Sequence, residues 1–182
     1  MSLIRGLSFF GLCFAFVVIA LGAWTRLVDA GLGCPDWPGC YGFVVFPTTE
    51  AEILIAEQRY PQFPYEIDKA IPEVVHRYFA AALGFIAILL VAFSYKHKLP
   101  TRIKAIASFL LFFICCQGLF GYLTVSLKLL PIIVTGHLFG GFITLSLFFY
   151  LFLNTSDGIK NHQIGHLKIL GGIALFALLI QI

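Results

Sequence analysis

Charged residues are scarce in this sequence. Asp, Glu, Lys and Arg together make up 12% of its 182 residues, whereas 60% are hydrophobic. Because soluble domains are about 25% charged, the composition excludes an ordinary soluble globular protein. The chain also lacks low-complexity segments and clear internal repeats, and its small net charge of +3 gives no indication of a nucleic-acid partner.

Long apolar segments take the place of charge. A membrane-spanning helix needs about 20 apolar residues, and four segments are long enough: 7–24, 71–95, 103–127 and 131–153. A fifth, 167–182, is shorter and fits a short span, an interfacial helix or the start of a larger region. We interpret 7–24 as a retained helix, because no small-residue cleavage pattern of a signal peptide follows it. The sequence therefore predicts an all-α integral membrane protein, a single membrane domain built as a four-helix transmembrane bundle with a short fifth apolar C-terminal helix.

Basic residues predict the orientation of these spans, since cytoplasmic loops carry an excess of Lys and Arg. They flank the predicted helix ends at Arg5, Lys96, Lys98, Arg102, Lys104, Lys160 and Lys168. The connection 26–70 instead carries seven acidic residues against three basic ones. We therefore expect a multi-pass protein of the cytoplasmic (inner) membrane, with its N-terminus in the cytoplasm and loop 26–70 on the outer side.

Loop 26–70 is the one predicted connection long enough to hold structure of its own. Such a long loop in a compact bundle is usually functional, and this one contains the turn-forming stretch GLGCPDWPGCYG. Its later part, TEAEILIAEQRYPQFP, has spaced apolar positions. That pattern predicts a short amphipathic helix on the membrane surface.

Two histidines lie inside the predicted spans. Segments 71–95 and 131–153 both enter from the outer side, which places His76 roughly 6 Å and His137 roughly 9 Å into the membrane. Histidine within a span is costly and indicates a functional site, and two at matched depth fit bis-imidazole ligation of a haem in the outer half of the bundle. The alternative is that each histidine hydrogen-bonds across helices and only stabilises the fold.

Small and polar residues accompany these histidines. Ala80 and Gly84 follow His76 on its helical face, Gly141 follows His137, and a flat macrocycle needs that clearance. Gln117 lies in the outer half of segment 103–127, where it could line the same pocket; close helix packing through neighbouring glycines is compatible with this.

The other histidines give weaker signals. His97 falls in a basic cytoplasmic turn, and His162 and His166 have the spacing of a metal pair on a helix. No acidic or thiol ligand is near them, so we do not expect a metal site there.

The stretch EVVHR places Glu73 and Arg77 beside His76. Glu73 shares a helical face with His76, so its carboxyl could exchange protons or stabilise a cationic intermediate at the haem edge. The alternative is a first-turn glutamate that complements the helix dipole. Arg77 could pair with a haem propionate, or extend to the lipid headgroups.

Cys34 and Cys40 enclose PDWPG in the outer loop, where the compartment permits disulfides. We expect them to be disulfide-bonded, either as a local loop staple or as a redox-active dithiol. Zinc is disfavoured because the loop offers no obvious further ligands.

The combination of motifs resembles the haem A synthases. The resemblance rests on GAWTRLVDAGLGCPDWPGC, EVVHR, QGLFGYLTV and VTGHL, which in this order cover most of residues 20–140. It implies that Glu73 is catalytic, that His76 and His137 ligate haem iron, and that Cys34 and Cys40 are the family's outer-loop pair. The implied reaction is oxidation of a methyl group of haem O to a formyl group, through hydroxylated intermediates, for cytochrome oxidase biogenesis.

The chain departs from the family pattern in size, because it resembles one four-helix half of the usual eight-helix enzyme. Either it is a compact form or something is missing, and we expect a homo-oligomer whose contacts replace the second half. The resemblance implies bound haem, as haem b or as haem O and haem A in the roles of substrate and product. Implied partners are membrane lipid, haem O synthase and the assembly of cytochrome oxidase. A bis-histidine membrane cytochrome b and a haem-holding assembly factor are the alternative functions.

Overall fold

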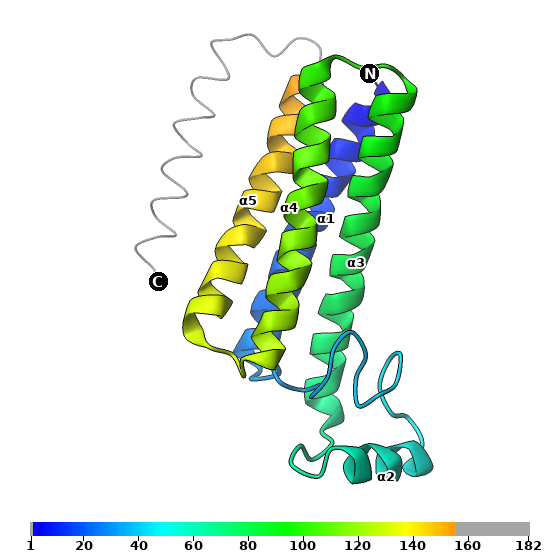
Figure 1. The fold of residues 1–182 in the computed structure, drawn as a ribbon, viewed down its shortest axis with the longest axis vertical. Helices are drawn as coiled ribbons and strands as arrows, with labels where there is room; N and C mark the ends of the chain where they lie inside the picture. Colours follow the sequence, from blue (N-terminus) through cyan, green and yellow to red (C-terminus); the bar gives the residue numbers. More distant parts are fainter. Residues whose placement is uncertain (1, 156–182) are drawn as a thin grey trace.

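The computed structural model describes residues 2–155, and its regular secondary structure over that range is helical (Figure 1). Four long helices and one short helix form it: α1 (Ser2–Leu27), α2 (Glu50–Arg59), α3 (Ile67–Lys96), α4 (Thr101–Ser126) and α5 (Pro131–Thr155). The predicted fifth apolar segment, 167–182, lies outside the described residues, as do His162 and His166.

The four long helices are each long and apolar enough to cross a membrane. A helix of 26 residues, the length of α1 and α4, extends about 39 Å, more than the roughly 30 Å of a hydrocarbon core. The prediction of an all-helical, multi-pass membrane protein with four spans is therefore confirmed for residues 2–155. The helix α3 begins at Ile67, one turn earlier than expected, so that Pro72 lies inside it.

The long helices form a bundle in which each packs between two neighbours. The contacting pairs are α1 with α3, α3 with α4, α4 with α5 and α5 with α1. Neighbours run antiparallel, and short turns join α3 to α4 and α4 to α5 (Figure 1). Consequently α3 and α5, which carry the two predicted haem ligands, lie diagonally opposite and run in the same direction.

One half of the bundle has a conventional apolar core. This core contains Ile4, Leu90, Leu110, Phe148 and Leu151, each at most 2% exposed. The ring of Phe148 lies directly against Gly11, where any side chain would collide with it. Close contact between α1 and α5 therefore depends on a residue without a Cβ.

Loop 28–49, α2 and the segment that leads into α3 lie at the opposite end of the bundle, with α2 crosswise beyond the end of α3 (Figure 1). These parts have a hydrophobic cluster of their own around Cys34, Cys40, Tyr41 and Ala56. Thr49 caps α2, since its hydroxyl accepts the Glu52 N–H and the Glu52 side chain accepts the Thr49 N–H. The short helix predicted from TEAEILIAEQRYPQFP is therefore present.

Candidate functional site

Two imidazoles lie close to each other in the half of the bundle that is next to loop 28–49. His76 comes from α3 and His137 from α5, and their ring centroids are 6.4 Å apart with an angle of 85° between the planes. The Nδ1 atoms of both rings are buried and have no hydrogen-bond partner within the described residues. Unpaired buried polar atoms are rare in folded proteins and call for an explanation.

The arrangement fits the geometry that a shared metal ion would require. A metal–imidazole nitrogen bond is about 2 Å long, so two rings on opposite sides of one ion have centroids about 6 Å apart. Residues 2–155 contain no group of three or more His, Cys, Asp or Glu that could hold a metal by themselves. Two imidazoles alone are the donor set for a metal whose remaining ligands come from a macrocycle, as in a bis-histidine haem.

Glycines on the neighbouring helices leave room for the two rings. A Cβ at Gly22 of α1 would lie 2.9 Å from Cε1 of His76, and one at Gly121 of α4 would lie 3.8 Å from Cε1 of His137. In the same turn of α1, the Thr25 hydroxyl donates to the Pro72 carbonyl at 3.2 Å. α1 therefore positions His76 through a glycine and a threonine that the sequence alone did not single out.

The other residues predicted to line the pocket lie at helix contacts. A Cβ at Gly84 would be 3.7 Å from Ile114 of α4, and one at Gly141 would be 3.4 Å from Ile19 of α1. The amide of Gln117 packs against Gly140 of α5, where no side chain would fit. Ala80 packs against the apolar core. These positions bring the helices close together around the histidines.

Glu73 is buried, with 5% of the residue exposed. One carboxylate oxygen accepts the backbone N–H of Cys34 at 2.8 Å, and the other pairs with Nη2 of Arg77 at 2.5 Å. Both oxygens are thus engaged, one by the outer loop and one by the same helix.

Arg77 reaches into the outer loop. Its Nη1 donates to the carbonyls of Asp36 at 3.0 Å, Gly39 at 2.5 Å and Pro38 at 3.4 Å, and its side chain is 14% exposed. The sequence suggested a haem propionate or lipid headgroups as its partner; the structure places Glu73 and the loop carbonyls around it.

Cys34 and Cys40 form a disulfide, which agrees with the expectation from their compartment. Within the ring that this bond closes, Trp37 contacts Tyr122 of α4 edge to face, with centroids 5.9 Å apart. Arg77 follows His76 in the chain and Tyr122 follows Gly121. The disulfide loop therefore connects α3 and α4 at the level of the two histidines.

Asp36 shapes this loop, and sequence reasoning did not identify it. Its carboxylate accepts the N–H of Tyr41 at 2.6 Å and that of Gly42 at 2.8 Å. Both residues have positive φ, 55° and 80°, a conformation that disfavours a tyrosine. An aspartate within a Pro- and Gly-rich stretch is a known turn signal, and it could have revealed this role.

Tyr41 attaches the loop to the segment that leads into α3. It is 1% exposed, and its hydroxyl donates to the Pro64 carbonyl at 3.0 Å. Burial, and secondarily the nearby carboxylate of Glu66, raises the pKa of Tyr41 to about 12.

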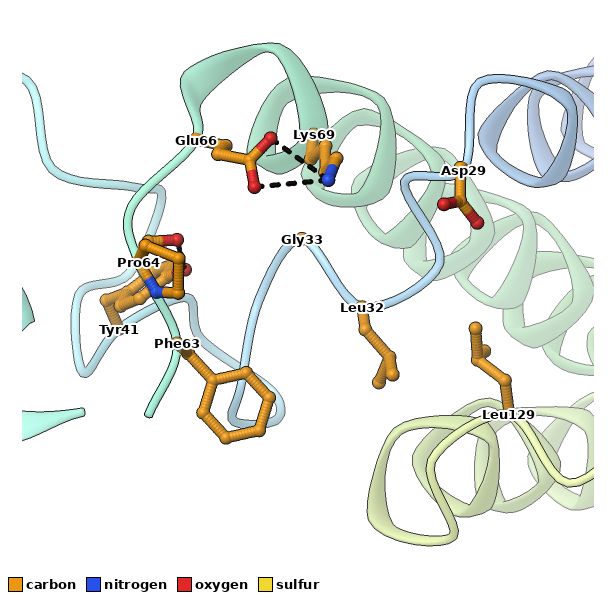
Figure 2. A pocket seen from close by; sticks show the side chains of 9 residues that line it. All are labelled: Asp29, Leu32, Gly33, Tyr41, Phe63, Pro64, Glu66, Lys69 and Leu129. Carbon is orange, nitrogen blue, oxygen red and sulfur yellow. Dashed lines mark hydrogen bonds and ion pairs between the residues drawn. The ribbon is translucent and has the colours of Figure 1, made fainter. Parts of the chain in front are cut away.

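A cavity of about 220 Å³ is lined by residues of loop 28–49, of the segment that leads into α3 and of the turn after α4 (Figure 2), and neither histidine lines it. Gly33, Tyr41 and Leu129 are among its lining residues, and a Glu66–Lys69 ion pair of 3.0 Å borders it (Figure 2). It is therefore separate from the candidate haem site.

A family model described as COX15-CtaA, cytochrome oxidase assembly protein, matches residues 5–182. The chain belongs to this family. It is also 40% identical over 174 residues to a haem A synthase of Shewanella oneidensis, an alignment that covers 94% of this chain and 52% of that protein. The chain thus spans about half the length of the curated relative it matches. No solved structure matches it.

Membership in the COX15-CtaA family confirms the resemblance carried by the four motifs. The fold of this COX15-CtaA chain brings those motifs together. GAWTR supplies Gly22 and Thr25 next to His76, and EVVHR supplies His76 itself with the Glu73–Arg77 pair. CPDWPGC then closes over that pair through backbone groups.

Proposed function

We propose that this COX15-CtaA chain forms a haem A synthase site, which binds haem between His76 and His137 and oxidises a methyl group of haem O to a formyl group. The observation that carries the proposal is the pair of buried imidazoles, 6.4 Å apart on diagonal helices and without partners for their Nδ1 atoms. The matched relative, named haem A synthase, supports the choice of reaction.

The proposal assigns a separate role to each residue of the site. His76 and His137 would hold the haem iron, and Gly22 and Gly121 leave space for their rings. The bound haem supplies a redox-active iron within a conjugated macrocycle. Glu73 accepts a proton or balances positive charge at the reacting edge, because it is the buried carboxylate one turn from His76.

Arg77 and Gln117 are the polar side chains that we assign to the edge of the macrocycle. Arg77 orients the Glu73 carboxylate by pairing with it. The disulfide loop covers the outer end of the site and limits the access of water.

The deciding experiment is to express the protein together with a haem O source, extract the bound haems and identify them by chromatography and mass. The proposal predicts haem A in the wild type. His76→Ala and His137→Ala should abolish both the low-spin bis-histidine spectrum and the product, and an unchanged spectrum in either variant would contradict the ligand assignment.

A bis-histidine membrane cytochrome b is the second candidate. The observation that favours it is that both oxygens of Glu73 are already engaged, by Cys34 and by Arg77, which suits a purely structural glutamate. In that case the extraction returns only haem b and the redox spectrum is intact. Recovery of unchanged haem O would instead support a haem-holding assembly factor.

The proposal includes the membrane context. The 182 residues form one membrane domain in the cytoplasmic membrane, with the N-terminus inside, the disulfide loop outside and α2 on the membrane surface. The protein assembles as a homo-oligomer, receives haem O from a haem O synthase and serves the assembly of cytochrome oxidase. Mass measurement in a mild detergent tests the oligomer, and fully active monomers would contradict it.

A further inference from the structure

The Glu73–Arg77 pair is held from outside α3 by one short segment. Cys34 donates its N–H to Glu73, and the carbonyls of residues 36, 38 and 39 accept from Arg77. These groups belong to residues 34–40, the segment whose ends the Cys34–Cys40 disulfide joins; the backbone of Gly33, directly before it, also hydrogen-bonds to Glu73. The position of the pair therefore depends on the backbone conformation of residues 34–40.

The disulfide alone does not determine that conformation. It fixes the two ends of the ring, whereas the directions of the carbonyls between them depend on how the chain turns. Asp36 sets the turn, because its carboxylate accepts two successive N–H groups, of Tyr41 and Gly42. Hydrogen bonds to a charged acceptor are stronger than neutral ones, and these two compensate for the positive φ angles of both residues.

Asp36 also contacts the pair through its own backbone. Its carbonyl accepts from Nη1 of Arg77 at 3.0 Å. Asp36 thus both sets the conformation of the loop and contacts the guanidinium of Arg77. The guanidinium in turn pairs with Glu73. Within residues 2–155 the side chain of Asp36 makes no hydrogen bond or ion pair with Glu73 or with either histidine, so any effect on them passes through the loop and Arg77.

We infer that Asp36 is a positioning residue, which holds the Arg77 guanidinium and thereby the Glu73 carboxylate in the geometry that the oxidation of haem O requires. The inference rests on the proposed function of this site. It assigns Asp36 no contact with the substrate.

The test uses Asp36→Ala and Asp36→Asn in the full chain. Glu57→Ala serves as the matched control, because Glu57 is an exposed acid on α2 and alanine is a good helix former. Three properties are compared: the haem spectrum, the rate of haem A formation at low and at saturating haem O, and hydrogen exchange of the Cys34 amide.

Asp36→Ala should keep its disulfide and its low-spin haem spectrum. We expect its turnover rate at saturating substrate to fall about 10- to 100-fold, with little change in KM, because small misplacements of a reacting group have effects of this size. The Cys34 amide, which Glu73 protects in the wild type, should exchange faster. The asparagine of Asp36→Asn can accept only one of the two N–H groups. Its turnover rate and the exchange rate of its Cys34 amide should therefore lie between those of Asp36→Ala and the wild type.

Wild-type turnover and exchange in both variants would overturn the inference. So would a loss of activity that only follows a loss of haem, since that indicates a general structural role. If the wild type itself forms no haem A, the proposed function fails, and the exchange of the Cys34 amide still decides whether Asp36 holds the pair. Should Asp36→Ala fail to fold, the near-isosteric Asp36→Asn gives the same comparison.

Discussion

Glu73 is buried, and like most buried polar groups it is engaged by hydrogen-bond donors. The Cys34 N–H and the Arg77 guanidinium each take one of its oxygens. A carboxylate held in this way is fixed in its orientation. Substitution of Glu73 by glutamine therefore removes the negative charge and keeps an oxygen that can accept from Cys34.

Glu73→Gln should retain haem and its spectrum but lose haem A formation. The glutamine oxygen can still accept the Cys34 N–H, but the amide NH2 is a donor and cannot accept from Arg77, so this ion pair is lost, which we expect to cost about 1 to 3 kcal/mol of stability. Arg77 keeps its loop carbonyls, so the protein should stay folded. Haem extraction and the absorption spectrum measure the two effects, with Glu57→Gln as the control. Wild-type product yield would leave Glu73 a structural residue and favour the cytochrome.

Tyr41 predicts a pH limit for the outer loop. Its pKa in the folded protein is about 12, against about 10 in an unfolded chain, so the folded loop favours the neutral phenol. The stabilisation is fully present below pH 10 and is lost as the pH rises from 10 to 12. Phenolate absorbance during alkaline titration should show a late-titrating tyrosine that disappears in Tyr41→Phe. Titration of all seven tyrosines near pH 10 would contradict the prediction.

At the scale of helices, glycines decide how closely the helices pack and where the histidines fit. α1 contacts α5 through Gly11 at one end and the His76 ring through Gly22 at the other. Close approach through small residues is characteristic of helices in membranes. The two contacts serve different purposes, because the first completes the apolar core and the second leaves room for an imidazole.

Gly22→Ala should weaken haem binding. The added Cβ would lie 2.9 Å from Cε1 of His76, which is too close, so the ring must shift away from its position opposite His137. Gly6→Ala is the matched control on the same helix, since nothing lies within 4 Å of its Cβ, and it should stabilise α1 by about 0.5 to 1 kcal/mol. Haem titration and the absorption spectrum compare the two variants. Equal haem affinity in both would show that the ring tolerates the contact.

At the scale of the whole molecule, the outer loop attaches to two neighbouring helices of the bundle. Arg77 attaches it to α3, and the contact between Trp37 and Tyr122 attaches it to α4. The apolar core occupies the opposite half. The histidines thus lie between a packed core and a covering loop.

The proposed orientation predicts where the disulfide can be reached. A membrane-impermeant thiol reagent added to intact spheroplasts should label Cys34 and Cys40 only after mild reduction, because the loop is outside and the cysteines are paired. The Cys34→Ser/Cys40→Ser double variant should show no labelling under the same conditions. Labelling without reductant would contradict the disulfide, and labelling only in opened membranes would reverse the orientation.

The sequence by itself determined the properties that depend on local composition. The length of each apolar segment set the number of spans, since a hydrocarbon core requires about 20 apolar residues whatever the surrounding fold. The polar residues within those spans identified His76, His137 and Glu73, because such residues are costly in lipid. The spacing of Cys34 and Cys40 in a predicted outer loop was enough to anticipate their disulfide.

Only the tertiary structure decided which of these groups meet. Helix periodicity gives the face of a residue but not its neighbour, so the 6.4 Å between the rings of His76 and His137 depends on the diagonal placement of α3 and α5. The sequence left several partners possible for Arg77. The turn set by Asp36, some forty residues earlier in the chain, brings backbone carbonyls within hydrogen-bonding distance of its guanidinium. These contacts join residues far apart in the chain, and their strength comes from burial, which exists only once the bundle and the loop have packed together.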